Sequence, residues 1–208
     1  MSKKCCHHEN KWRKRLKRIC AGLVIFNFIL LVTILLIWAI LQPKKPRFIL
    51  QDVTVSAFNV TSPNLLTSTF QVTIYSRNPN DNIGIYYDKI DVYATYQSQQ
   101  ITYFTQIPPT YQGHKDANVW SPFLSGDNVP VAPYNGIALS QDQADGTVIL
   151  FIKLNARVRW KVGTTLTTGK YGLHVKCPAY ITFGNQNTGI VVGNAVKYQL
   201  SSSCSVSV

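Results

Sequence analysis

The sequence is poor in charged side chains, and acidic ones are the scarcest. Charged residues make up 14% of the 208 residues, against roughly 25% in an average globular protein. Only nine residues are acidic, and every one after Glu9 is an aspartate. At 46% hydrophobic residues, the chain is unlike a disordered one, which combines low hydrophobicity with high charge. The 12 glycines and 10 prolines are too few for collagen or a low-complexity array.

Sequence patterns of common catalytic sites are missing too. The chain has no Gly-x-Ser-x-Gly, no His-Glu-x-x-His and no phosphate-binding glycine loop. After residue 48 the only histidines are His114 and His174. We interpret His114 as a loop histidine rather than half of a dyad with Asp116, because residues two apart need not face each other. We therefore expect no enzyme activity, no small-molecule substrate, no metal and no cofactor.

The positive charge that the chain does have is concentrated around one segment. The net charge is +12, and residues 1–18 and 42–47 carry most of it. A nucleic-acid-binding protein needs a basic face on a folded domain, so we expect no nucleic-acid partner. The basic residues nearest the segment would attract anionic headgroups of the inner leaflet, although a purely topogenic role explains them equally well; they are Arg13, Lys14, Arg15, Lys17 and Arg18.

The segment between these charges, residues 19–41, contains no charged residue. A helix of this length spans roughly 35 Å, enough to cross a hydrocarbon core of about 30 Å. The run is longer than a signal-peptide core and ends without an Ala-x-Ala site. We therefore predict an uncleaved signal-anchor. The excess of Lys and Arg before it places residues 1–18 in the cytoplasm, followed by the stalk 42–47 and an exported domain, 48–208.

Two features of the exported part fit an oxidising, secretory environment. Asn59 begins an Asn-x-Thr sequon and is therefore a predicted glycosylation site. Cys177 and Cys204 are the only cysteines after the predicted span. They either form a disulfide or remain two buried thiols, and the sequence does not decide between these alternatives.

The remaining three cysteines lie on the cytoplasmic side or at the start of the span. Cys5, Cys6 and Cys20 are candidates for reversible palmitoylation because they lie near the inner leaflet. Cys5 and Cys6 are followed by two histidines, but four adjacent residues can hardly surround a tetrahedral zinc ion. We therefore favour lipidation over a metal site.

Residues 48–208 alternate between apolar and polar side chains, which is typical of strands. The clearest strand is residues 147–162, and the dipeptides Asn135-Gly136 and Asp145-Gly146 indicate turns. No long helical pattern is found in this part. The expected fold is mainly β, an antiparallel β-sandwich of the immunoglobulin or fibronectin-III kind. Shorter alternating segments are 53–57, 69–74, 90–96, 101–104, 173–177, 196–200 and 204–208.

Several blocks of the exported part resemble those of the plant NDR/HIN-like proteins. The blocks are Asn-Pro-Asn at 78–80, Ile-Gly-Ile-Tyr-Tyr-Asp at 83–88, Pro-Pro-Thr-Tyr-Gln-Gly-His-Lys at 108–115 and Arg-Val-Arg-Trp-Lys-Val-Gly at 157–163. Cys177 and Cys204 also fall where this family has cysteines. The motif positions that carry the resemblance are Asn78, Pro79, Asn80, Tyr86, Tyr87, Asp88, Tyr111, Gln112, Gly113, His114 and Trp160.

The resemblance implies a late-embryogenesis-abundant (group 2, WHy) β-sandwich at the plant plasma membrane, with roles in defence and hypersensitive-type responses and no catalytic activity. Both the general cell surface and plasmodesmata fit this location. It implies protein partners and binding by the exported domain. The alternative is a desiccation or stress protectant that binds apolar ligands or shields membranes. From the residues alone, the blocks are interpreted first as structural: Asn-Pro-Asn as a strand exit, and Gly84 and Gly113 as positions of unusual backbone angles or close approach.

Overall fold

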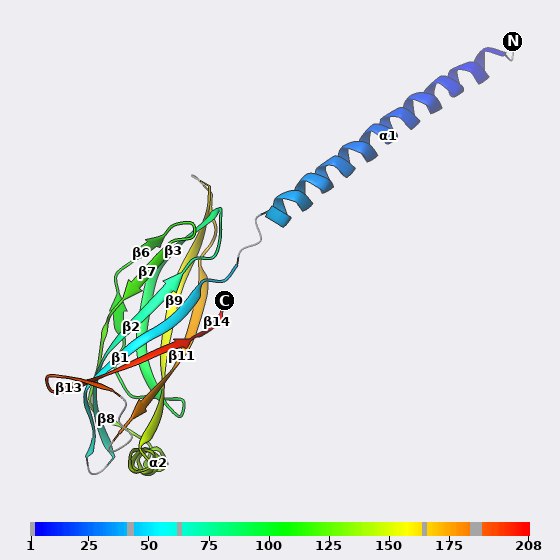
Figure 1. Cartoon of the computed structure of the whole chain (residues 1–208). Helices are drawn as coiled ribbons and strands as arrows, with labels where there is room; N and C mark the ends of the chain where they lie inside the picture. Colours follow the sequence, from blue (N-terminus) through cyan, green and yellow to red (C-terminus); the bar gives the residue numbers. More distant parts are fainter. Residues whose placement is uncertain (1–2, 41–43, 62–63, 164–165, 184–188) are drawn as a thin grey trace. The chain divides into compact units, whose positions relative to one another are not determined.

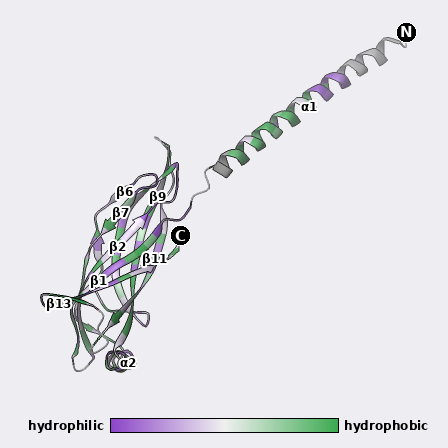
Figure 2. Ribbon diagram, viewed as in Figure 1, coloured by the Kyte–Doolittle hydropathy of each residue, from purple (hydrophilic) through white to green (hydrophobic). Residues whose placement is uncertain are grey.

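The computed structural model describes residues 3–40, 44–61, 64–163, 166–183 and 189–208, with side chains given from residue 12 onward except 37–40 (Figure 1). The chain divides into two compact units, Met1–Pro43 and Lys44–Val208. The first unit contains helix α1 (Lys3–Ile40). Within α1, the basic residues precede a long apolar stretch (Figure 2). Except for the partly buried Val32, the described apolar side chains of α1 are exposed.

The second unit, hereafter the β-domain, is built from two antiparallel sheets. The first sheet has the order β12-β13-β1-β2-β7, and β8 also pairs with β2. Its strands are β1 (Arg47–Thr61), β2 (Leu65–Arg77), β7 (Ala117–Trp120), β8 (Phe123–Pro130), β12 (Ile190–Val192) and β13 (Ala195–Ser203).

The second sheet has the order β14-β11-β9-β3-β4, with β10 paired to β9 and with β5 and β6 paired to β3. Its strands are β3 (Ile83–Tyr96), β4 (Gln99–Gln100), β5 (Thr105–Ile107), β6 (Thr110–Gln112), β9 (Thr147–Val162), β10 (Leu166–Thr167), β11 (Tyr171–Thr182) and β14 (Ser205–Ser207). The expected mainly-β, antiparallel architecture is therefore confirmed.

The core lies between the sheets and follows from the period-2 alternation. In β9, seven alternate residues from Val148 to Trp160 are buried, so one face of the strand points inward along most of its length. The opposite sheet contributes Phe70, Val72 and Ile74 from β2. Burial of side chains of this size contributes roughly 1.5–3 kcal/mol each, and this contribution holds the two layers together.

A single residue joins the two sheets along one side of the sandwich. On one side the chain passes from β13 to β14 through the single residue Cys204, and so crosses from the first sheet to the second. Cys204 is bonded there to Cys177 of β11, and its backbone N–H donates to the carbonyl of Phe48. The disulfide therefore fastens the crossing strand to the second sheet.

A short helix, α2 (Pro133–Ala144), was not predicted. Asn135 and Gly136 lie inside it, so the turn expected at this dipeptide is wrong. Pro133 at the start of the helix has a φ suited to a helix, and its missing backbone N–H is not needed there, because the first N–H groups of a helix have no partner within it. Only Asn135, Gly136 and Leu139 are buried, and one buried apolar side chain gives no helical periodicity to detect. Asp145-Gly146 ends α2 and leads into β9, with Gly146 at a φ of 87°, rather than closing a hairpin.

The β-domain has two ends, which are named here by what lies at them. At the Lys44 end, β1 begins and β2 ends, with Arg47 opposite Arg77, and β3 begins and β9 ends, with Ile83 opposite Val162. At the α2 end, β1 ends and β2 begins, and Tyr96 of β3 donates to Asp142 of α2. Asn59 lies near this second end, opposite Thr67.

Candidate functional site

The family-motif residues, although far apart in sequence, lie mainly at the Lys44 end. The Asn-Pro-Asn segment is in the connection between β2 and β3, as expected for a strand exit. The buried side chain of Asn78 donates to the carbonyls of Ile83 (2.7 Å) and Gly113 (2.8 Å). Its Oδ1 accepts from the backbone N–H (3.1 Å) and the side-chain amide (2.9 Å) of Asn80. One amide thus joins three segments of chain.

Asn80 connects this turn to the first residues of the β-domain. Its Oδ1 accepts from the backbone N–H of Lys44 at 2.7 Å, and its Nδ2 donates to the Lys44 carbonyl at 2.8 Å. The side chain therefore pairs with the backbone as a neighbouring strand would. Because Asn80 is buried, this pairing fixes the point where the chain enters the domain.

Gln112 forms the centre of a second buried polar cluster. Its amide donates to the carbonyls of Ser76 (2.9 Å) and Asp116 (3.2 Å), and its Oε1 accepts from the hydroxyl of Tyr87 (3.0 Å). Tyr87 is buried, and this burial raises the pKa of its hydroxyl, so it stays a neutral donor. Buried polar groups need partners of this kind, and the geometry makes this cluster a structural connection between the two sheets.

Tyr86 and Tyr111 form a partly exposed aromatic pair on the second sheet. Their ring centroids are 4.5 Å apart. The Lys161 ammonium lies 5.7 Å from the Tyr86 ring centroid and 5.5 Å from that of Tyr111. Gly84 lies beneath Tyr111, and a Cβ atom at residue 84 would collide with the Tyr111 hydroxyl and ring carbons. The close approach expected at Gly84 is therefore present.

Asp88 and Arg159 form the best-defined ion pair of the domain. Arg159 donates through Nε and Nη2, at 2.6 to 3.1 Å, to both carboxylate oxygens of Asp88. The guanidinium hydrogen bond lowers the pKa of Asp88, and the pKa of Arg159 is raised in turn by the same contact. The guanidinium carbon also lies 5.4 Å from the Tyr86 ring centroid.

The segment from Gly113 to Asp116 does not form a catalytic arrangement. The Asp116 carboxylate accepts from the backbone N–H groups of Gly113 (3.3 Å) and Ala117 (2.8 Å), so its oxygens hold the turn. The expectation for Gly113 is wrong: an added Cβ would meet only Asp116, at 3.7 Å, and its φ is not positive. Lys115 instead has the left-handed conformation, at a φ of 54°, and its ammonium pairs with Asp81 at 2.9 Å, which lowers the pKa of that carboxyl. His114 is exposed.

Trp160 is buried near the end of β9, and its backbone is hydrogen-bonded to Thr168, which follows β10. Its backbone N–H donates to the Thr168 hydroxyl at 3.0 Å, and its carbonyl accepts from the Thr168 backbone N–H at 2.9 Å. The indole adds to the core cluster. Trp160 is therefore interpreted as a packing residue.

The other sequence-predicted sites lie apart from this cluster. Asn59 is exposed on β1, so its side chain is accessible for glycosylation. Cys20 is exposed in α1, where Arg13, Lys14, Arg15, Lys17 and Arg18 also lie. The side chains of Cys5 and Cys6 are outside the described residues. No group of three or more His, Cys, Asp or Glu suited to a metal ion occurs in the described part of the chain.

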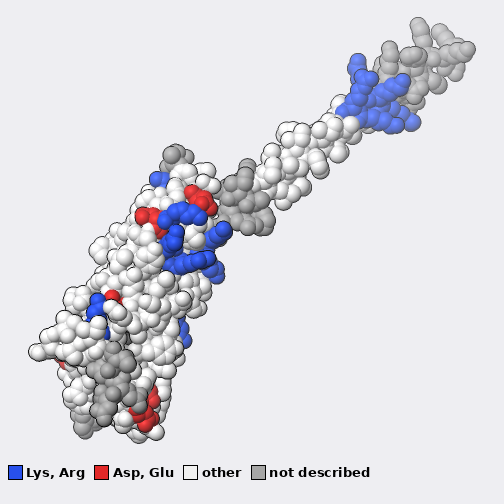
Figure 3. All heavy atoms as spheres, in the orientation of Figure 1, with Lys and Arg blue, Asp and Glu red and all other residues white. Residues whose placement is uncertain are grey.

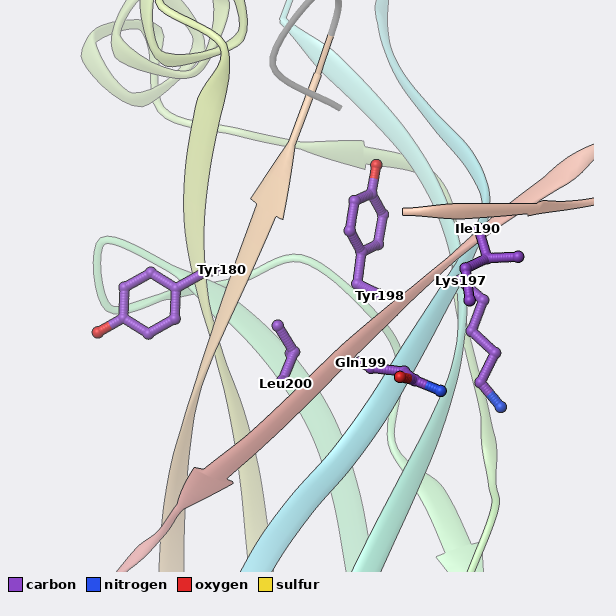
Figure 4. Close-up of a pocket in the computed structure, with 6 residues that line it drawn as sticks. All are labelled: Tyr180, Ile190, Lys197, Tyr198, Gln199 and Leu200. Carbon is purple, nitrogen blue, oxygen red and sulfur yellow. The ribbon is translucent and has the colours of Figure 1, made fainter. Parts of the chain in front are cut away.

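One pocket, of about 270 Å³, lies on the first sheet beside β11 (Figure 4). It is lined mostly by β13, with Lys197, Tyr198, Gln199 and Leu200, and is completed by Tyr180 and Ile190. Figure 4 shows the Tyr180 ring directed away from Lys197. Ligand pockets for small molecules usually measure roughly 300–1,000 Å³ and are mainly apolar, so this one is small and mixed in character.

Comparison with known proteins decides the family. A family model described as "Late embryogenesis abundant protein" matches residues 73–177, which include most of the motif cluster. The NDR1/HIN1-like protein 1 of Arabidopsis thaliana is 63% identical over 99% of this chain and 100% of its own length. The chain belongs to the NDR1/HIN1-like family. This is a family of stress- and defence-related plant proteins with a late-embryogenesis-abundant domain.

Two further NDR1/HIN1-like proteins of Arabidopsis thaliana are also similar. Protein 12 is 61% identical and covers 92% of this chain and 91% of its own length. Protein 26 is 42% identical over 76% of this chain and 75% of its own. Neither the family description nor these names are those of enzymes. The similarity to protein 1 includes α1, which is long and apolar enough to cross a membrane by length and composition.

Sequence reasoning missed some residues that organise this end. Ser76 and Asp116 take part in the Gln112 cluster through backbone carbonyls, which no side-chain pattern reveals. Lys44 was assigned to the stalk, but its backbone pairs with Asn80. The Asp88–Arg159 pair was also missed, because Arg159 lies opposite Tyr86 and Asp88 lies at a register shift between Tyr87 and Lys89, which alternation in the sequence does not reveal.

Proposed function

We propose that this chain is a single-pass plasma-membrane protein of the plant defence response, and that it acts through binding by an extracellular β-domain rather than by catalysis. The observation that carries this proposal is a disulfide in the part of the chain that follows an apolar helix of membrane-spanning length. Disulfides persist in oxidising compartments, and the basic residues before the helix favour a cytoplasmic N-terminus. Membership of the NDR1/HIN1-like family supports the role in defence.

The surface that we assign to protein partners is an aromatic edge formed by Tyr103, Phe104 and Phe123. All three side chains have little cover: Tyr103 is 58% exposed, Phe104 60% and Phe123 62%. The segments that carry them run together, since Tyr103 donates to the Ser125 carbonyl and Thr105 to the Phe123 carbonyl. Exposed aromatic side chains are frequent energetic centres of protein interfaces.

The motif cluster supports a scaffold role more than a reactive one. The polar atoms of Asn78, Asn80 and Gln112 are engaged in internal hydrogen bonds, and the Asp116 carboxylate holds backbone N–H groups. A catalytic base or nucleophile needs a free and oriented lone pair. Among the described residues, this cluster offers none aimed at a cavity.

Topology is tested with the full chain expressed in plant cells. We expect Asn59→Gln to remove an endoglycosidase-sensitive shift in mobility, and external protease to digest the β-domain while a tag at residue 1 stays protected in sealed cells. A tag that is digested together with the β-domain, or the absence of any glycan on the wild type, would count against the extracellular assignment. The Thr61→Ser variant, which keeps the sequon, is the matched control.

Binding through the aromatic edge is tested with the Phe104→Ser/Phe123→Ser variant. We expect normal surface delivery but a reduced hypersensitive-type response to pathogen challenge, and loss of the partners that proximity labelling detects for the wild type. The matched control is Tyr134→Ser/Ile137→Ser, which removes apolar side chains that are 70% and 69% exposed on α2. Equal responses of both variants and the wild type would exclude the aromatic edge as the binding surface.

The protectant alternative has less support. A β-domain that carries apolar ligands needs a cavity for them, and the described pocket at Tyr198 is small and includes Lys197 and Gln199. The alternative predicts that the protein preserves a labile enzyme or liposomes through drying. Our proposal predicts no such protection beyond that given by an unrelated protein of similar charge.

A further inference from the structure

Charge is distributed unequally between the two ends of the β-domain. The α2 end carries Asp127, Asp142 and Asp145, and no Lys or Arg among the described residues. At the Lys44 end lie six cations that form no ion pair with a described carboxylate: Lys44, Lys45, Arg47, Arg77, Lys161 and Lys170. Figure 3 shows Lys and Arg side chains gathered over the end where β1 begins, with acidic side chains beside them, and further acidic side chains near α2.

The cations at the Lys44 end are placed where they repel one another. Arg47 of β1 lies directly opposite Arg77 of β2 in the register, and like charges in directly opposite positions destabilise a sheet. Both side chains are exposed. The acids of this end have other cations as their contact partners, because Asp81 pairs with Lys115 and Asp88 with Arg159. Lys44 and Lys170 act on these two carboxylates only at longer range. An external anion is therefore the partner that this end lacks.

The short connection between α1 and the β-domain indicates which kind of anion is available to this end. Only three residues separate Ile40, where α1 ends, from Lys44, where the β-domain begins. A fully extended chain covers at most about 14 Å over this interval. The pairing of Lys44 with the buried Asn80 leaves no further slack on the domain side. The covalent connection therefore keeps Lys44 within this distance of Ile40 wherever α1 is anchored.

We infer that the Lys44 end binds the phosphate-bearing anionic headgroups of the membrane in which α1 is anchored, so that the α2 end is directed away from the surface. This inference rests on the membrane anchoring proposed above. It gives the unpaired cations a partner and keeps the acidic end away from headgroups that would repel it. It also leaves the sequon at Asn59, near the α2 end, on the side with room for a glycan.

The test measures lysine acetylation in the full chain, reconstituted into nanodiscs of phosphatidylcholine alone or with added phosphatidylglycerol, and is read by mass spectrometry. We expect Lys44, Lys45 and Lys170 to react roughly fivefold more slowly on the anionic discs, since each basic residue near such a surface gains on the order of 1 kcal/mol. Lys153 and Lys176, on the middle of the second sheet, serve as internal controls and should not change. High salt should abolish the difference.

The variant arm compares two changes of equal charge. Lys161, the fourth lysine of this end, should also react more slowly on the anionic discs and serves as the readout in the variants. Lys44→Gln/Lys45→Gln/Lys170→Gln should lose this protection of Lys161, whereas Lys89→Gln/Lys153→Gln/Lys176→Gln should keep it. Equal acetylation rates on both kinds of disc would overturn the inference. Protection by soluble heparin on neutral discs, without protection by phosphatidylglycerol, would also overturn it, because it would indicate that an acidic polymer is the partner. A chain that fails to enter nanodiscs at all would overturn the membrane anchoring as well, so the two failures are distinguishable.

Discussion

Asn78→Ala removes the side chain on which the Lys44 end most depends. Asn78 is fully buried and takes part in four hydrogen bonds, two donated to the Ile83 and Gly113 carbonyls and two accepted from Asn80. Alanine leaves these groups without partners in a closed space. Each lost bond costs about 1 kcal/mol net, and a buried group left unsatisfied costs about 1–3 kcal/mol. Some relaxation is expected, so we predict a loss of about 3–5 kcal/mol in the free energy of unfolding.

The assay is thermal unfolding of the full chain in nanodiscs, followed by near-ultraviolet circular dichroism. For a domain of this size, about 1 kcal/mol corresponds to roughly 2–4 °C in the midpoint, so the expected decrease is about 10 °C. Asn82→Ala is the matched control, because Asn82 is exposed in the same turn and should change the midpoint by little. If Asn78→Ala unfolds within about 2 °C of that control, the structural role assigned to the turn is wrong.

Three further predictions concern the same domain. Removing the disulfide with Cys177→Ala/Cys204→Ala should destabilise the domain by about 3.5 kcal/mol, the loop-closure value for a sequence separation of 27, as measured by urea unfolding, and an unchanged midpoint would contradict this. Gly84→Ala should cost about 1–3 kcal/mol because its Cβ collides with Tyr111, and Tyr111→Ala in the same chain should restore much of that loss. The pKa of Asp88 is lowered by Arg159, so the stability from this pair is present above the ordinary pKa of an aspartate and is lost as pH falls through the lower, folded-state pKa. Asp88→Asn should therefore be less stable at neutral pH and lose less stability on acidification, and parallel acid-unfolding curves would refute the assignment.

The strands were predictable where alternation is long and uninterrupted. Strand β9 has the bounds that were expected, because apolar residues recur at every second position from Val148 to Trp160 and glycines lie just outside both ends. The short strands β6, β7 and β8 were not predicted. Tyr111, Val119 and Phe123 are exposed there, so the sequence shows no regular inward face.

The candidate site was predictable as a set of residues but not as an arrangement. The motif blocks named Asn78, Asn80 and Gln112, and local rules placed Asn-Pro-Asn at a strand exit. The contact of Asn80 with Lys44 joins residues 36 apart, and that of Arg159 with Asp88 joins residues 71 apart. Such pairings depend on strand register, which is set by packing of the whole sandwich. The same holds for the charge difference between the two ends, which no linear count of Lys and Arg shows.

The most direct test of the account is the thiol and protease status of the full chain in intact plant cells. Free thiols are blocked with an alkylating reagent before lysis, external protease is applied to a parallel sample, and both are analysed by mass spectrometry. The account predicts that Cys177 and Cys204 are found linked to each other in a domain that external protease removes, while peptides containing Arg13 to Arg18 remain protected. Alkylated Cys177 and Cys204 in a domain that protease leaves intact would contradict it.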